Sequence, residues 1–147
     1  MTSRIILTFT VTLFVLSSCS KYDDGPTFSL FSKTDRVTNS WVYTEVYRNG
    51  LNITLGAEAN NQKYTESTIG FADDGRFSFV DAYRDSTTIN GDGYWEFVND
   101  DESLQLTYDS SALIRTLKIN RLERSYLWLE ENLGNNNTLI IKLSSND

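Results

Sequence analysis

Apolar residues recur at every second position through the middle of the chain, and this period constrains the fold more than any other feature of the sequence. The alternation lies between Ile69 and Tyr108, and its clearest pairs are Ile69 and Phe71, Phe77 and Phe79, Trp95 and Phe97, and Leu104 and Leu106. Turn-forming residues fill each gap between the pairs. A period of two is typical of antiparallel strands that bury one face. The sequence therefore predicts an all-β fold.

Strand signals continue on both sides of this region. The Asn49-Gly50 dipeptide predicts a tight turn in a first hairpin, between strands at 41–47 and 51–55. The other expected strands lie at 64–71, 76–83, 94–98, 104–108, 113–122, 126–130 and 138–143, while 86–89 either continues the strand 76–83 or forms a short strand of its own. No stretch of the mature chain has helical periodicity. We expect an antiparallel up-and-down meander of about eight strands that closes into a small barrel, because closure removes unpaired edges.

The first 18 residues have the features of a secretory signal peptide. Arg4 precedes a mostly apolar run at 5–16, which is shorter than the roughly 20 residues that span a bilayer. The run ends in Leu-Ser-Ser-Cys, which resembles the lipobox of bacterial lipoproteins, where the cysteine is acylated with fatty acids such as palmitate and becomes the N-terminus. An ordinary cysteine beside an ordinary cleavage site is the alternative. Since Cys19 is the only cysteine, no intrachain disulfide competes for it, and we expect it to carry the lipid.

Residues 19–39 are expected to form the lipidated cysteine and a flexible tether, ahead of a barrel domain at 40–147. The segment is polar and contains the only proline. Its start, with Lys21, Asp23 and Asp24, resembles the surface-export signal of Bacteroidetes lipoproteins, in which acidic residues soon follow the lipidated cysteine. Acidic pairs also occur in linkers for solubility alone. The resemblance implies a lipid anchor in the bacterial outer membrane and exposure at the cell surface.

Four motifs in the barrel region resemble the lipocalin-like domains of Bacteroidetes lipoproteins. They are a tryptophan at the start of the first strand (Trp41), Gly-Phe-x-Asp-Asp-Gly-x-Phe at 70–77, Gly-x-Trp-x-Phe from Gly93, and Tyr-Leu-Trp-Leu-Glu at 126–130. The motifs supply turns, a close backbone approach and core side chains. The resemblance covers about 40–143 and implies a small barrel with a lumen, without indicating a ligand.

The composition excludes several classes of function. The formal net charge is −7, and 12 basic side chains (13 less Arg4) face 20 acidic ones after the signal peptide, so the surface repels nucleic acid. Histidine is absent, which removes the commonest general base and metal ligand. Once Cys19 is acylated, a Ser-His-Asp triad, a cysteine nucleophile and a histidine-bearing zinc site are all excluded. We therefore predict a non-catalytic protein without a cofactor or metal.

The acidic residues give no convincing site. The sequence Asn-Gly-Asp-Gly at 90–93 is similar to the middle of a calcium loop, but this register places Thr88 and Asn99 where an aspartate and a bidentate glutamate belong. We interpret 90–93 as a hairpin turn. Most other carboxylates lie in turns, where we expect solvent to surround them, so they give no sign of a catalytic pair. Glu96 is on a strand, but we expect it to face solvent because its neighbour Trp95 faces the core.

Two functions remain open. The aromatic residues, Trp41, Trp95 and Trp128 among them, could line a ligand cavity or stack on sugars, although we expect inward ones to fill the core. Asp-Ser-Thr at 85–87 resembles an O-glycosylation acceptor, and a polar strand end explains it equally well. The protein is either a binding module for a small apolar or glycan ligand, or a filled barrel that serves as a platform for an envelope or host protein. An open cavity would distinguish them.

Overall fold

The computed structural model describes residues 22, 29–55 and 61–146. It contains a one-turn helix, α1 (Lys33–Val37), a 3-10 turn, η2 (Tyr64–Glu66), and nine strands: β1 (Asn39–Arg48), β2 (Leu51–Asn52), β3 (Thr68–Phe71), β4 (Arg76–Ala82), β5 (Thr88–Val98), β6 (Ser103–Tyr108), β7 (Ile114–Leu122), β8 (Tyr126–Gly134) and β9 (Asn137–Ser145). None of the helices in these residues is long and apolar enough to cross a membrane.

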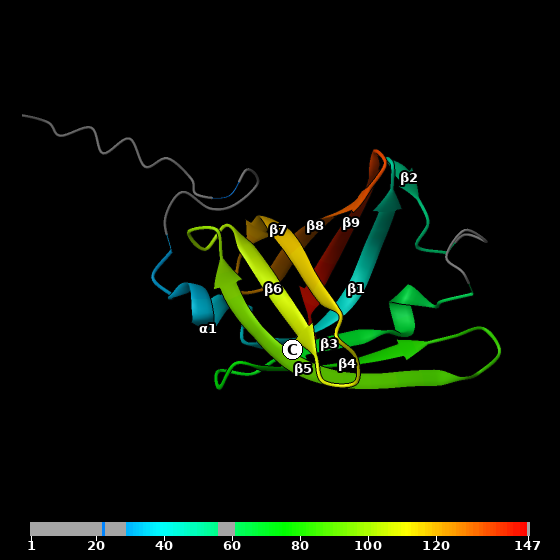
Figure 1. Cartoon of the computed structure of the whole chain (residues 1–147), viewed down its shortest axis with the longest axis horizontal. Coiled ribbons are helices and arrows are strands. Elements are labelled where there is room, and N and C mark those ends of the chain that lie inside the picture. The colour runs from blue at the N-terminus through cyan, green and yellow to red at the C-terminus, as the bar shows by residue number, and fades with distance from the viewer. Residues whose placement is uncertain (1–21, 23–28, 56–60, 147) are drawn as a thin grey trace, which may run out of the picture.

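The strands follow one another around a closed antiparallel barrel (Figure 1). Each strand from β3 to β9 pairs with the next, and β1 pairs with β3 on one side and β9 on the other, which closes a barrel of eight strands. The closing pair β1–β9 extends from Trp41, opposite Ser145, to Arg48, opposite Leu139. The short strand β2 pairs with the end of β1 and adds a ninth strand. The expected all-β barrel of about eight strands is confirmed.

The alternating apolar residues point into the barrel. Trp95 is 7% exposed, and its indole Nε1 donates a hydrogen bond to the Ala72 carbonyl over 2.9 Å. The next residue, Glu96, is exposed and accepts a hydrogen bond from Gln105. We expected the alternating apolar residues of the central strands to face the barrel interior, and this is confirmed. Their side chains belong to one continuous core.

The helix α1 closes one end of the barrel. Ser32 caps it, because its hydroxyl accepts from the Asp35 amide while the Asp35 carboxylate accepts from the Ser32 amide. Val37 is completely buried, and Arg36 donates to the Leu122 carbonyl at the end of β7 over 2.8 Å. Residues 32–39, which we expected in a flexible tether, are thus folded against the barrel. Sequence periodicity could not show this, since one helical turn is too short to have a period.

The residues at 90–93 are not a hairpin turn, so that prediction is wrong. They lie inside β5, where Gly93 is opposite Phe77 and Gly91 is opposite Phe79. The two rings lie over the glycines, and a Cβ atom at either glycine would overlap the facing ring. These glycines therefore allow a close approach within a sheet, which is the other common use of glycine in a strand.

Several strand boundaries also differ from the expected ones. The run 86–89 neither continues β4 nor forms its own strand, because Thr88 begins β5 after a turn. The expected strand at 64–71 starts with η2, so its extended part is β3 alone. The hairpin at Asn49 and Gly50 exists, with φ angles of 52° and 80°, but β2 contributes only two paired residues.

Candidate functional site

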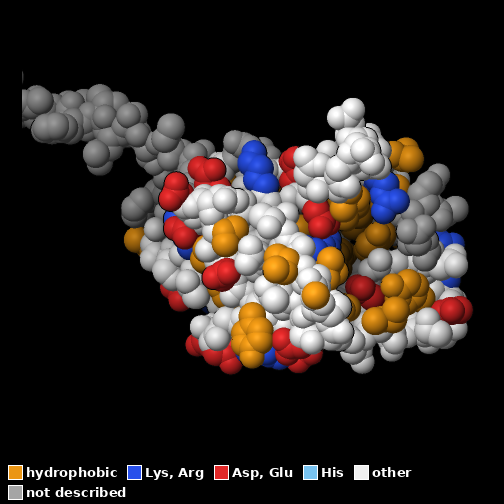
Figure 2. Space-filling view, in the orientation of Figure 1, with side chains coloured by type: hydrophobic (Ala, Val, Ile, Leu, Met, Phe, Trp, Pro, Cys, Tyr) orange, Lys and Arg blue, Asp and Glu red, His pale blue; other side chains and the backbone are white. Residues whose placement is uncertain are grey.

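The barrel lumen contains a cavity of about 130 Å³. Figure 2 shows a hollow to the right of centre, with hydrophobic, acidic and basic side chains around it. Much of the wall is aliphatic and comes from five strands: Ile69, Leu106, Leu117, Leu129, Ile141 and Leu143. An engineered apolar cavity of about 150 Å³ is large enough to bind benzene. The lumen is therefore open, and it can hold one small chemical group.

The cavity lies in the half of the barrel away from α1. The helix meets β7 at its last residue, Leu122, whereas the cavity is lined by Leu113 and Arg115 at the other end of this strand. Seven residues of an extended strand span about 23 Å. Since Leu113 is 50% exposed, it marks the mouth of the cavity at the end that α1 leaves open.

Four polar side chains line the same cavity: Tyr43, Asp81, Tyr108 and Arg115. Each lies two residues from another inward-facing residue of its strand and therefore also faces inward; Asp81, for example, follows Phe79 by two residues on β4. A bulge in β1 between Tyr43 and Glu45 allows both Tyr43 and Val46 to face inward. The cavity thus combines an aliphatic wall with polar groups from β1, β4, β6 and β7.

Arg115 is held by Glu131 from β8. Its Nε donates to Glu131 Oε1 over 2.9 Å, and its Nη2 donates to Glu131 Oε2. The Nη1 atom donates to the Tyr108 hydroxyl over 3.2 Å. Burial lowers the pKa of Arg115, but the hydrogen bonds and charge of Glu131 outweigh burial and raise it above its ordinary value. Arg115 therefore stays charged, and the two-point contact with Glu131 balances that charge.

Asp81 has no such partner. Its Oδ1 accepts a hydrogen bond of 2.9 Å from the Gln62 amide, and no cation of the described residues lies within ion-pairing distance of it. Burial raises the pKa of Asp81, and the charge of Arg115 opposes this shift. Burial also raises the pKa of the Tyr43 hydroxyl, and the Asp81 charge adds to the rise. The acidic group and the Tyr43 hydroxyl therefore share one poorly solvated region.

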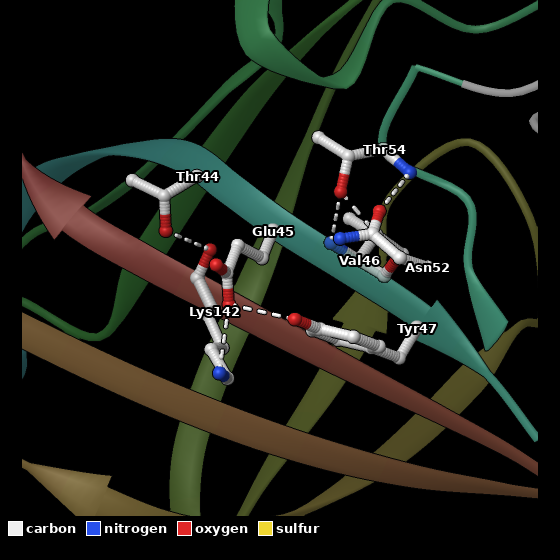
Figure 3. A network of polar contacts seen from close by, with 7 residues as sticks. All are labelled: Thr44, Glu45, Val46, Tyr47, Asn52, Thr54 and Lys142. Atoms are coloured by element: carbon white, nitrogen blue, oxygen red, sulfur yellow. Dashed lines mark hydrogen bonds and ion pairs between the residues drawn. The ribbon is translucent and has the colours of Figure 1, made fainter. Parts of the chain in front are cut away.

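On the outer face of the barrel, Lys142 organises a network of polar contacts (Figure 3). Its Nζ lies 2.7 Å from Glu45 Oε2, which also accepts a 3.1 Å hydrogen bond from the Tyr47 hydroxyl. The same ammonium lies 4.6 Å from the centre of the Trp128 ring. Trp128 thus packs on the outside of β8 among cations, and it does not line the cavity.

The predicted anchor and export residues, Cys19, Lys21, Asp23 and Asp24, lie outside the described residues and stay predictions. The possible glycosylation site at 85–87 lies in the turn between β4 and β5, where Asp85 Oδ1 accepts from both the amide and the hydroxyl of Thr87. In the described residues, no three His, Cys, Asp or Glu side chains are placed to hold a metal ion.

Sequence reasoning missed the charged residues of the cavity and the glutamate that holds Arg115. Asp81, Arg115 and Glu131 each lie two residues from an apolar residue that faces the barrel interior. A charged side chain is unusual at such an inward-facing position. That break in the apolar pattern was the available signal. Its meaning depends on the barrel register, which brings the three strand ends to the same end of the lumen.

Comparison with known proteins identifies the fold. No family model matches the sequence, and no curated protein matches it either. Among solved structures, a lipocalin-like protein from Bacteroides uniformis is similar, with a TM-score of 0.55 and 14% sequence identity over 75% of this chain and 98% of that one. An uncharacterized protein from Bacteroides eggerthii gives a TM-score of 0.52 and 15% identity over 74% of this chain and 98% of that one. The chain therefore has a lipocalin-like barrel fold.

Proposed function

We propose that this protein is a lipid-anchored, non-catalytic binding module whose barrel holds a small amphiphilic ligand. The open cavity carries this proposal, because aliphatic walls beside a few polar groups are typical of small-molecule sites. The alternative, a filled barrel that serves as a platform, requires a plugged lumen. Core residues such as Trp41 and Trp95 do fill the half near α1, but the half lined by Asp81 is open.

The proposed anchor would set the orientation of the barrel. Tyr22 is 4% exposed, and its hydroxyl donates to the Asp101 carbonyl in the turn between β5 and β6, at the α1 end. Cys19 is only three residues earlier, a distance of at most about 10 Å for an extended chain. A lipid on Cys19 would thus keep the α1 end near the membrane and leave the cavity mouth facing away. We further propose the outer leaflet of the outer membrane, on the basis of the acidic residues near Cys19.

The anchor can be tested in cells. Cys19→Ala should abolish incorporation of labelled palmitate, because no other thiol can accept the acyl chain. Protease added to intact cells should degrade the wild-type protein, whereas the double variant Asp23→Ala and Asp24→Ala should keep its label and resist the protease. Unchanged labelling of Cys19→Ala would refute the lipoprotein proposal, and a protease-resistant wild type would refute surface exposure.

The cavity can be tested by an NMR titration with n-butanol, a small alcohol that fits the cavity volume. We expect saturable shifts of amides around the cavity, and Leu117→Trp should weaken the binding at least tenfold because the larger ring occupies the space. Thr116→Trp is the matched control, since Thr116 is exposed on the outside of the same strand. Leu113→Trp at the mouth is a second blocking variant that leaves the packed wall intact. Equal binding to all four proteins would show that the ligand does not enter the lumen.

A further inference from the structure

The cavity lining contains one carboxylate, Asp81, which is not paired with the cation of the lining, Arg115. Of the described residues in the lining, Arg115 alone is a cation, and Glu131 engages it at two atoms. Asp81 is left with a single hydrogen bond, from the neutral Gln62 amide. Among the described residues, Arg48 on β1 also faces inward at this end; its Nε is buried without a hydrogen-bond partner, but Arg48 does not line the cavity. An ionised Asp81 is therefore a carboxylate in the cavity lining to which none of the described cations is bound.

Three aromatic residues, Tyr43, Phe79 and Tyr108, line the same cavity as Asp81. Phe79 precedes Asp81 on the same face of β4, and its ring centre lies 5.6 Å from that of Tyr108 in an edge-to-face arrangement. The Tyr43 ring comes from β1, which only β3 separates from β4, and its centre lies 5.9 Å from that of Tyr64. Aromatic faces attract a cation by roughly 0.5–1 kcal/mol at exposed sites and more when it is desolvated. A carboxylate among aromatic rings favours a positively charged group.

We propose that the cavity selects a small primary alkylamine in its ammonium form. The ammonium would donate hydrogen bonds to the Asp81 carboxylate and the Tyr43 hydroxyl, and the alkyl chain would lie along Leu106 and Leu117. A ligand with a carboxylate would instead meet Asp81 at the polar end, with Arg115 already bound to Glu131. The inference rests on the proposed function and adds the chemical class of the ligand.

The volume of the cavity limits the length of the ligand's alkyl chain. A volume of about 130 Å³ is slightly below the roughly 150 Å³ that accepts benzene, so the ligand, or the part of it that enters, has about four to six heavy atoms. A longer amine would have to leave its tail outside the mouth at Leu113.

The test compares n-butylammonium, n-butanol and butyrate, which each have an unbranched chain of four carbon atoms and differ in charge. Binding to the purified protein is measured at pH 7 by NMR titration. We expect n-butylammonium to bind at least tenfold more tightly than n-butanol, and butyrate to show no saturable binding. Asp81→Asn should weaken the binding of n-butylammonium at least tenfold and leave the affinity for n-butanol unchanged. Asp92→Asn is the control, because it makes the same change on the exposed face of the neighbouring strand.

Folding should not obscure this result. Because burial raises the pKa of Asp81, its ionised form destabilises the folded protein above the ordinary pKa of aspartate, and Asp81→Asn removes that cost at pH 7. Tyr43→Phe, which removes only a hydroxyl, should weaken the binding of n-butylammonium by a smaller factor than Asp81→Asn does. If n-butanol binds as tightly as n-butylammonium, or butyrate binds most tightly, the inference is overturned and the proposed function survives. If none of the three probes binds, both are overturned.

Discussion

Replacing Trp95 with alanine is expected to lower the free energy of unfolding by about 3 to 5 kcal/mol. The side chain is 7% exposed, and its ring packs edge-on against Phe71 and Phe97, at centroid distances of 5.7 and 5.5 Å. Its removal leaves a cavity that neighbouring strands cannot close, because the barrel pairs them on both sides. It also leaves the Ala72 carbonyl without its indole donor.

Urea denaturation measures this loss, and two controls test its cause. Trp128→Ala removes the same side chain from the outer face, where its ring contacts the cations of Arg121 and Lys142. We expect a loss of about 1 to 2 kcal/mol there, from two cation–π contacts at a partly exposed site. Glu96→Ala should change stability by less than about 0.5 kcal/mol. Equal losses at the two tryptophans would mean that burial inside the barrel is not what makes Trp95 important.

The architecture was predictable because burial acts on every second residue. In a strand with one buried face, apolar residues such as Trp95 and Phe97 must alternate with outward-facing ones such as Glu96. This pattern can be recognised without knowing which strands pair with each other. The number of strands followed from the turns between them. Closure followed from a physical preference, since an eight-stranded barrel leaves no unpaired edge.

The use of each glycine was not predictable in the same way. Glycine next to asparagine or aspartate favours tight turns, so Asn-Gly-Asp-Gly at 90–93 looked like a hairpin. The structure places these residues mid-strand because Phe77 and Phe79 on β4 need backbone without side chains opposite them. That requirement depends on which residues of two strands face each other, and the sequence of one strand alone does not contain this information. By contrast, Asn49-Gly50 needs only its own backbone angles, and its turn was predicted correctly.

The candidate site depends even more on long-range geometry. Asp81 and Arg115 belong to strands separated by more than thirty residues, and nothing in either strand indicates that they line one cavity. Their sequence signal is only that each occupies an inward position. Likewise, Tyr22 followed no periodic pattern, yet it is buried against the turn that contains Asp101. Such contacts require the register of the whole barrel.

Replacing Gly93 with alanine is expected to lower the free energy of unfolding by about 3 kcal/mol, near the upper end for overpacked sites. A Cβ atom at this position would overlap the Thr107 carbonyl oxygen and lie 2.6 Å from the Phe77 ring. The oxygen belongs to the backbone of β6, which pairs with β5 from Gly93 to Val98. It therefore cannot move away without disturbing the pairing of two strands in the closed barrel.

Gly70→Ala is the matched control, because Gly70 also lies inside a strand but has room for a methyl group. The nearest atoms to its Cβ position would be Ser78 Oγ at 3.7 Å and the Asn39 carbonyl oxygen at 3.9 Å, which are ordinary contacts. We expect Gly70→Ala to be neutral or to stabilise by up to about 1 kcal/mol, because alanine restricts the unfolded chain. Urea denaturation of both variants, with the wild type, separates the general effect of glycine from the local one. A similar small effect at both positions would mean that β5 and β6 can separate enough to admit a side chain, and the close approach inferred at Gly93 would then not constrain the barrel.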